Sequence, residues 1–158
     1  MESIETRAMR QAIAASRWGM ENDKGGPFGA AVIRDDSIVA STYNRVTSTD
    51  DPTAHAEVHV IRMACDILGT YDLSDCELVT SCEPCPMCFG AIYWARFKKV
   101  YYSNTKADAA DIGFDDSFIY EELAKPMAER SIPFERINIP DARKVFDDWK
   151  LKEDKAEY

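Results

Sequence analysis

Two short strings, far apart along the chain, constrain this sequence more than any other feature. They are His55-Ala56-Glu57 and Pro84-Cys85-Pro86-Met87-Cys88. One imidazole, two thiols at a C-x-x-C spacing and one carboxylate are the components of a catalytic zinc site, in which three protein ligands leave the fourth position for water. Zinc makes such a water acidic enough to act as hydroxide near neutral pH. The fold is therefore expected to bring the two strings together, with Glu57 carrying protons between water and substrate.

The spacing inside each string predicts that both lie at the starts of helices. Cys85 and Cys88 are three residues apart and would share one helix face. The prolines on either side of Cys85 are tolerated in a first helical turn. His55 and Glu57 would diverge in the middle of a helix, but at an N-terminus both can reach a point beyond the end. We therefore expect two helix N-termini to face one metal ion, where free N–H groups and the helix dipole stabilise thiolates and anionic intermediates.

Two neighbouring residues offer alternative ligands, and a C-x-x-C pair alone also occurs in structural zinc sites and redox sites. Cys82 extends the run to C-x-x-C-x-x-C, which is similar to an iron–sulfur spacing. It ends a strand-like run, residues 77–82, and is expected to point away from the later pair. His59 follows His55 by four residues, but the zinc-protease pattern places Glu directly after the first His. We expect neither residue to bind the metal.

Composition restricts the class of protein and the class of partner. The chain has 158 residues, enough for one domain with a substantial core. It contains no apolar run long enough to span a membrane and begins without the apolar segment of a secretory signal. Its five cysteines, an odd number, favour a metal site in a reducing, cytoplasmic location over a disulfide framework. The net charge of −9 disfavours nucleic acid as a partner.

Hydrophobic periodicity and turn residues predict an alternating order of helices and strands. The expected helices cover residues 4–20, the segment from the cap at 53 to about 68, 86–96, 117–130, and a last helix from 141 or 142 to 157. The expected strands cover 28–33, 37–43, 77–81, 99–102 and 134–139. Thr53 is expected to cap the second helix and Gly69 to end it. This order predicts an α/β protein, with a three-layer α/β/α arrangement around a central mixed five-stranded sheet. Right-handed crossovers would make the third and fourth strands parallel to a neighbour.

Four segments carry a resemblance to a known family. They are Gly25-Gly26-Pro27-Phe28-Gly29-Ala30, Asp51-Pro52-Thr53-Ala54-His55-Ala56-Glu57-Val58, Ser81-Cys82-Glu83-Pro84-Cys85-Pro86-Met87-Cys88 and Gly113-Phe114-Asp115-Asp116-Ser117-Phe118-Ile119-Tyr120. The pattern H-x-E followed by P-C-x-x-C is the known signature of zinc-dependent nucleobase deaminases. Over nearly its whole length the chain resembles the cytidine-deaminase-like superfamily. The last segment and the Lys-Ala-Glu-Tyr end resemble, more narrowly, the small zinc-dependent bacterial guanine deaminases.

The resemblance implies a reaction and a cofactor. Members of this family convert guanine and water to xanthine and ammonia with one Zn²⁺ per subunit. His55, Cys85 and Cys88 match the zinc ligands of the family. Glu57 matches the residue that protonates the ring nitrogen beside the reacting carbon and then helps to protonate the departing amine.

The resemblance also implies substrate contacts. Phe28 and Asn44 match positions that contact the purine, and Asp116 resembles a second catalytic carboxylate that shuttles a proton or holds the exocyclic amine. Ala56 and Trp94 are further candidates for the pocket wall. Most of these residues have an ordinary structural alternative. Phe28 could pack in the core, Trp94 could pack in the core or line a dimer face, Asn44 could stabilise a turn, and Asp115 and Asp116 could be solvated helix caps.

The end of the chain is expected to complete the site. Tyr158 matches a residue whose tail closes the pocket, whereas a chain end is otherwise usually disordered. Residues 1–158 would form a single deaminase domain in a homodimer. In relatives the C-terminal segment, about 130–158 here, is exchanged between two protomers, and exchange of a terminal element is physically plausible.

Proteins with several other functions could carry the same two sequence motifs. A deaminase of guanosine, cytosine or a guanine-like triazine would carry the same zinc residues. A tRNA adenosine deaminase would as well, but the acidic charge disfavours it. A zinc-stabilised domain without activity would be expected to fill all four metal positions with protein, whereas Glu57 stands beside only three ligands.

Overall fold

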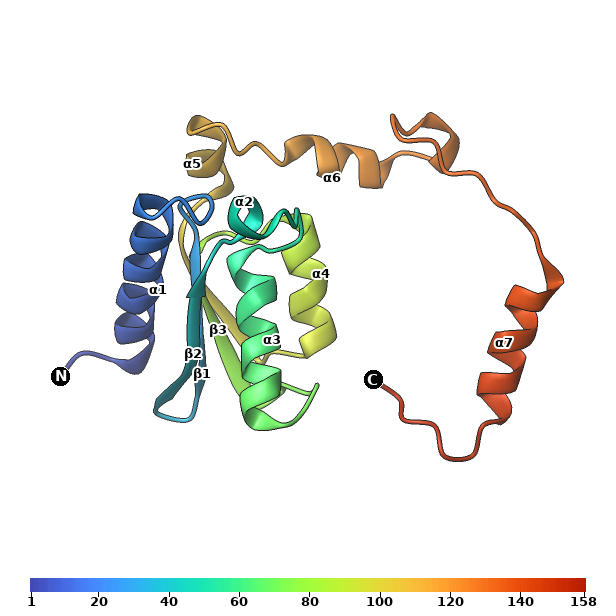
Figure 1. The fold of residues 1–158 in the computed structure, drawn as a ribbon, viewed down its shortest axis with the longest axis horizontal. Coiled ribbons are helices and arrows are strands. Elements are labelled where there is room, and N and C mark those ends of the chain that lie inside the picture. Colours follow the sequence, from blue (N-terminus) through green and yellow to red (C-terminus); the bar gives the residue numbers. More distant parts are fainter. The chain divides into compact units, whose positions relative to one another are not determined.

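A four-stranded sheet with helices on both faces organises the first part of the chain (Figure 1). The computed structural model describes all 158 residues as two units, Met1–Asp116 and Ser117–Tyr158. The strands are β1 (Gly29–Arg34), β2 (Ser37–Tyr43), β3 (Cys76–Cys82) and β4 (Lys99–Asn104), in the order β2-β1-β3-β4. β1 runs antiparallel to β2 and β3, while β3 and β4 are parallel. The prediction of an α/β protein with a mixed sheet is confirmed, but the prediction of a fifth strand is wrong.

Two separate apolar layers hold the helices on the sheet. On one face, Ala8 of α1 (Ile4–Glu21) packs against side chains of β1 and β3 that include Ile33 and Val79. On the other face, α3 (Ala56–Leu68) and α4 (Pro86–Ala95) cover a core that includes Val60 and Leu78. Because side chains alternate along a strand, the neighbours Leu78 and Val79 serve opposite layers. This alternation produces the expected three-layer arrangement in the first unit.

The start of α3 differs from the sequence prediction in a way that matters for the site. His55, not Thr53, is the N-cap residue. Thr53 is held in the preceding loop, where its backbone N–H and hydroxyl both donate to Asp51 Oδ1 at 2.8 and 2.7 Å. Gly69 ends α3 in the left-handed conformation, as predicted. The loop therefore places His55 directly at the N-terminus of α3.

Two short helices were not predicted. α2 (Val46–Thr49) follows β2, and α5 (Lys106–Asp111) follows β4. α5 starts with a capping box, in which the Thr105 hydroxyl accepts from the Asp108 N–H at 3.2 Å and the Asp108 carboxylate accepts from the Thr105 N–H at 2.8 Å. The spacing Thr-x-x-Asp was a signal for this helix start.

The second unit contains helices but no strand and no buried side chain. It consists of α6 (Ser117–Ala124), the 3₁₀ turn η1 (Met127–Glu129) and α7 (Pro140–Leu151). Residues 134–139 were expected to form a strand, but they form neither a helix nor a strand. No other strand of the unit is available to pair with them. The apolar residues Phe134 and Ile137 of this segment are exposed. Across the whole chain, no helix is both long and apolar enough to cross a membrane.

Candidate metal centre

His55, Cys85 and Cys88 converge at one point between α3 and α4. Their ligand atoms all lie within 4.8 Å of one another. His55 Nδ1 is 3.5 Å from Cys85 Sγ and 3.6 Å from Cys88 Sγ, so one nitrogen faces both sulfurs. His55 is the N-cap of α3 and Cys85 the N-cap of α4, with Pro86 in the first turn. The structure thus places two helix N-termini at one point, as the spacing predicted.

The electrostatics of the three side chains suit a cation. The pKa of Cys85 is lowered to about 4, chiefly by the hydrogen bond from Cys88 and further by the His55 ring. The hydrogen bond to Cys85 raises the pKa of His55, and the bond to Cys85 together with burial raises the pKa of Cys88. Cys85 is accordingly a thiolate, and its negative charge favours the protonated forms of its two neighbours. A divalent cation at this point would compete with protons for the same three side chains.

This donor set fits zinc. One imidazole nitrogen and two sulfurs are ligands that zinc prefers, and three protein ligands are the number found in catalytic sites. Cys88 is fully buried and the other two residues are half-buried. No other group of three metal-binding side chains occurs in the chain. The residues present therefore form a candidate zinc site.

Glu57 lies beside this group without being one of the three. It is on the first turn of α3 and only 5% exposed. Its Oε2 is 3.2 Å from Cys88 Sγ. Its Oε1 accepts a hydrogen bond of 2.6 Å from the hydroxyl of Thr80, a buried residue of β3 that was not predicted as a site residue. The alternation that directs Leu78 toward α3 also directs Thr80 there, and this was the available signal.

Asn44 anchors the loop that carries the expected substrate contacts. It is buried, and its Oδ1 accepts from the backbone N–H groups of Gly26 and Val46 at 3.3 and 3.1 Å. A Cβ on Gly25 would come within 2.3 Å of that oxygen, so the glycine permits the close approach. Because both bonds use the carbonyl oxygen, the amide NH₂ of Asn44 is left to donate elsewhere.

Phe28 packs against Phe114 in an edge-to-face pair, with ring centroids 4.9 Å apart. Phe28 is half-buried and contacts the core below α3. Phe114 belongs to the Gly-Phe-Asp-Asp segment but was not predicted as a site residue. The pair connects that segment to the Gly-Gly-Pro-Phe loop within the first unit.

The two adjacent acids after Phe114 differ in their surroundings. Asp116 is half-buried, and its pKa is raised by burial and by the nearby Cys85 thiolate. Asp115 is exposed. The carboxyl group of Asp116 is thus influenced by a residue of the candidate metal centre.

The other three predicted substrate contacts, Ala56, Trp94 and Tyr158, differ in their burial. Ala56 is fully buried in the first turn of α3, beside His55. Trp94 is 70% exposed on α4, so packing of its side chain in the core is excluded. Tyr158 is an exposed residue of the second unit.

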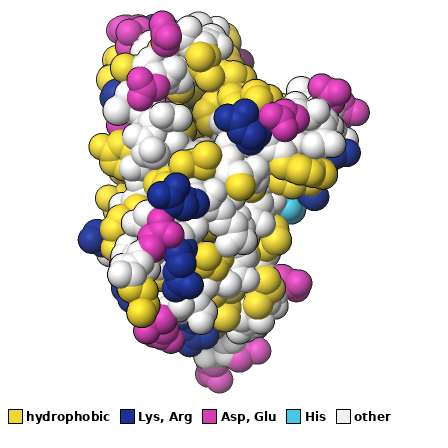
Figure 2. Space-filling model, turned by 90° about the vertical axis from the view of Figure 1, so that its left-hand side faces the viewer, with side chains coloured by type: hydrophobic (Ala, Val, Ile, Leu, Met, Phe, Trp, Pro, Cys, Tyr) yellow, Lys and Arg dark blue, Asp and Glu magenta, His cyan; other side chains and the backbone are white.

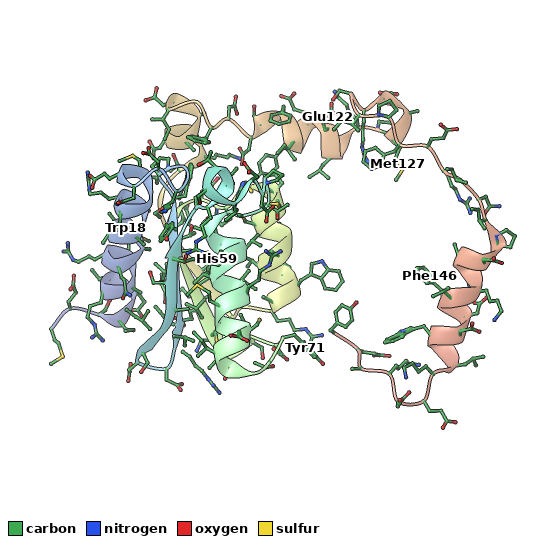
Figure 3. All side chains as sticks on the ribbon, viewed as in Figure 1. Trp18, His59, Tyr71, Glu122, Met127 and Phe146 are labelled. Atoms are coloured by element: carbon green, nitrogen blue, oxygen red, sulfur yellow. The ribbon has the colours of Figure 1, made fainter.

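Neither alternative ligand joins the metal group. The Cys82 thiol is buried at the end of β3, and its sulfur is 3.7 Å from the Thr105 carbonyl oxygen. Burial raises its pKa to about 11. His59 lies one turn further along α3 (Figure 3), where burial and the charges of Arg45 and Arg62 lower its pKa.

Comparison with known proteins gives a consistent family. The family model described as the cytidine and deoxycytidylate deaminase zinc-binding region matches residues 2–104. The chain is 51% identical over 150 residues to the guanine deaminase of Bacillus subtilis, covering 95% of this chain and 96% of that protein. An X-ray structure of guanine deaminase from Bacillus subtilis matches with a TM-score of 0.94 at 50% identity, covering 97% of this chain and 98% of that chain. The tRNA-specific adenosine deaminase of Agrobacterium fabrum is 39% identical over 110 residues, covering 68% of this chain and 72% of that protein.

Proposed function

Because the chain belongs to the cytidine and deoxycytidylate deaminase zinc-binding family, we propose that it is a zinc-dependent hydrolase that converts guanine and water to xanthine and ammonia. The observation that carries the proposal is the buried carboxylate of Glu57 beside a group of only three metal ligands. A structural zinc site would normally use a fourth protein ligand in that place. The relation to the guanine deaminase of Bacillus subtilis supports the choice of guanine.

The reaction replaces a C–NH₂ bond of the base by C=O and releases ammonia. When bound, zinc supplies the means to deprotonate water near neutral pH. Glu57 accepts the proton that the attacking water releases and delivers it to the ring nitrogen next to the reacting carbon. It then helps to transfer the remaining proton of that water, now on the hydroxyl of the attacked carbon, to the amine, so that C=O forms as the C–N bond breaks and ammonia leaves. Burial of Glu57 keeps competing water away from these transfers.

The surrounding residues suit a flat, neutral base. The Phe28 ring offers an apolar surface, and the Asn44 NH₂ is held in place to donate to an acceptor on the base. Asp116, with its raised pKa, can accept or return a proton at the exocyclic amine. Ala56 and Trp94 complete the proposed set of contacts.

The surface charge favours a small substrate over RNA. The net charge is −9, and on the face shown in Figure 2 Lys and Arg side chains are interspersed with acidic and apolar ones. A phosphate backbone requires a basic surface, whereas guanine does not. The relation to tRNA-specific adenosine deaminases covers less of the chain, at lower identity.

The second unit supports a proposal about assembly. Its exposed apolar side chains and lack of any buried residue indicate that it requires a surface to pack against. We propose a cytoplasmic homodimer in which the C-terminal segment, about 130–158, is exchanged between protomers and Tyr158 closes the pocket of the partner subunit. A tail of this kind would leave no room for the ribose of guanosine.

Assay of the zinc-loaded protein with guanine tests the proposed function. We expect xanthine and ammonia in equal amounts, and little or no turnover of guanosine, cytosine or adenosine in tRNA. Glu57→Gln is expected to lower kcat by about 10²- to 10⁴-fold while zinc content and melting temperature stay unchanged. Glu77→Gln, which removes a carboxylate of β3 that pairs with Lys98, serves as the control. Absence of guanine turnover by the zinc-loaded protein would contradict the proposal.

A further inference from the structure

Thr80 places a hydroxyl group at a buried position between the sheet and α3. Cys76, Leu78 and Thr80 alternate along β3 on the face that α3 covers, and the first two belong to the apolar layer. Thr80 is only 1% exposed. A hydroxyl at such a position is costly unless it forms a hydrogen bond, so its partner is informative.

Two acceptors surround this hydroxyl, which has a single proton. Thr80 Oγ1 lies 2.6 Å from Glu57 Oε1 and 3.0 Å from the carbonyl oxygen of Cys82. A bond to a carboxylate is shorter and stronger than one to a neutral carbonyl, and 2.6 Å lies in the range of charge-assisted O–H···O⁻ bonds. The proton is therefore donated to Glu57.

We propose that Thr80 is a positioning residue that fixes the rotation of the Glu57 carboxylate. Thr80 donates a hydrogen bond to this carboxylate from the buried interior of the sheet. Glu57 Oε2 also lies 3.2 Å from the Cys88 sulfur, and a thiolate that binds zinc has no proton to donate. Thr80 thus holds Oε1 toward β3 and leaves Oε2 directed at the metal centre.

The backbone around Thr80 makes this support rigid. Thr80 is paired with Ala30 of β1 on one side and with Tyr102 of β4 on the other, in the interior of the sheet. A β-branched side chain also has a restricted χ1 angle in a strand. Glu57, in contrast, has three side-chain torsions and lies in the first turn of a helix. The sheet therefore supplies a fixed point for a flexible carboxylate.

This inference rests on the proposed function, and substitutions at Thr80 test it. Thr80→Val keeps shape and removes the donor. We expect kcat for guanine to fall by about 10- to 100-fold, as for loss of a hydrogen bond to a charged group, with KM within about 3-fold of the original. Thr80→Ser keeps the donor and should restore kcat to within about 3-fold of the original. Thr42→Val is the matched control, because Thr42 is buried and pairs with the opposite side of Ala30.

A spectroscopic measurement separates this inference from the choice of substrate. The infrared band of the Glu57 carboxylate, identified by subtracting the spectrum of Glu57→Gln, is expected to shift in Thr80→Val but not in Thr80→Ser or Thr42→Val. Zinc content should be equal in all variants. A shifted band in a protein that does not deaminate guanine would uphold the role of Thr80 and overturn the proposed function.

Other outcomes of these measurements would contradict the positioning role of Thr80. Normal kcat and an unshifted band in Thr80→Val would overturn the role of Thr80 while the proposed function stands. If Thr80→Val does not fold, Thr80→Ala removes the same donor with less bulk and takes its place in both measurements. Failure of Thr80→Ser to restore kcat, or a fall in zinc content with loss of the donor, would also contradict a positioning role.

Discussion

At the scale of single residues, the surroundings of the cysteines give their thiol groups very different pKa values. Burial raises the pKa of Cys76 to about 12 and that of Cys82 to about 11, whereas Cys88 and His55 lower the pKa of Cys85 to about 4. A thiol whose pKa is lowered stays ionised at any pH above that value. Near pH 6, Cys85 is therefore a thiolate and the other two are neutral thiols.

This difference predicts selective alkylation. After zinc is removed with a chelator, iodoacetamide at pH 6 is expected to modify Cys85 well before Cys76 or Cys82, because the thiolate is the reactive form. Peptide mass spectrometry measures the order. Labelling should decrease as the pH approaches 4, and restoring zinc before treatment should protect Cys85. Equal labelling of all three cysteines would contradict the assigned charges.

Substitution of the same residues separates ligands from neighbours. Cys85→Ser is expected to deplete bound zinc, because the hydroxyl group is a far weaker ligand than a thiolate. Cys82→Ser should retain zinc, since Cys82 is outside the metal group even though it shares the C-x-x-C spacing. Elemental analysis of the two purified variants provides the comparison. Full zinc occupancy in Cys85→Ser would remove Cys85 from the set of ligands.

At the scale of helices, two glycines allow a matched stability test. Gly69 ends α3 with φ of +64°, whereas Gly90 lies inside α4, and an added Cβ would meet nothing within 4 Å at either position. Gly69→Ala is expected to cost about 1 kcal/mol, because alanine resists the left-handed conformation. Gly90→Ala should stabilise by about 0.5–1 kcal/mol. Denaturant unfolding measures both, and equal shifts in the same direction would contradict this account.

The elements that the sequence predicted well are those whose local signals agree with their packing. β2 has the expected bounds, 37–43, and Gly69 ends α3 as its conformational freedom suggested. The segment 134–139 has a suitable pattern for a strand, but pairing depends on a partner that local sequence cannot reveal. Thr53 was predicted as a cap because it is a good N-cap residue, yet its hydroxyl donates to Asp51 instead.

In the candidate site, too, some features follow from local sequence and others only from the folded structure. Metal ligands could be predicted because zinc requires particular atoms at particular spacings, and the structure brings His55, Cys85 and Cys88 together. Thr80 could not, because a threonine in a strand is ordinary and only its distance to Glu57 distinguishes it. Similarly, the conformation of Asn44 follows from backbone N–H groups whose positions depend on the folded loop.

At the scale of the whole molecule, the two units bury their apolar residues very differently. The first unit has two enclosed layers on the sheet, while the second has no buried residue. On α7, the apolar side chains Val145, Phe146 and Trp149 recur at helical spacing and are exposed. Figure 3 labels Phe146 on this helix. The opposite side carries the ion pairs Arg143–Asp147 and Lys144–Asp148. This pattern is typical of a helix that packs against another surface on one side.

If that surface belongs to the partner subunit, Phe146→Asp should weaken the dimer. Burial of a phenylalanine contributes about 1.5–3 kcal/mol, and a two-fold dimer contains the substitution twice, so the dissociation constant should rise on the order of 100-fold or more. Sedimentation velocity over a range of concentrations measures this change. Lys144→Ala alters the net charge equally but on the polar side of α7, and should leave the dimer intact. Zinc content should be unchanged in both variants, because every metal ligand belongs to the first unit. A Phe146→Asp protein that associates as the parent protein does would show that α7 does not hold the two protomers together.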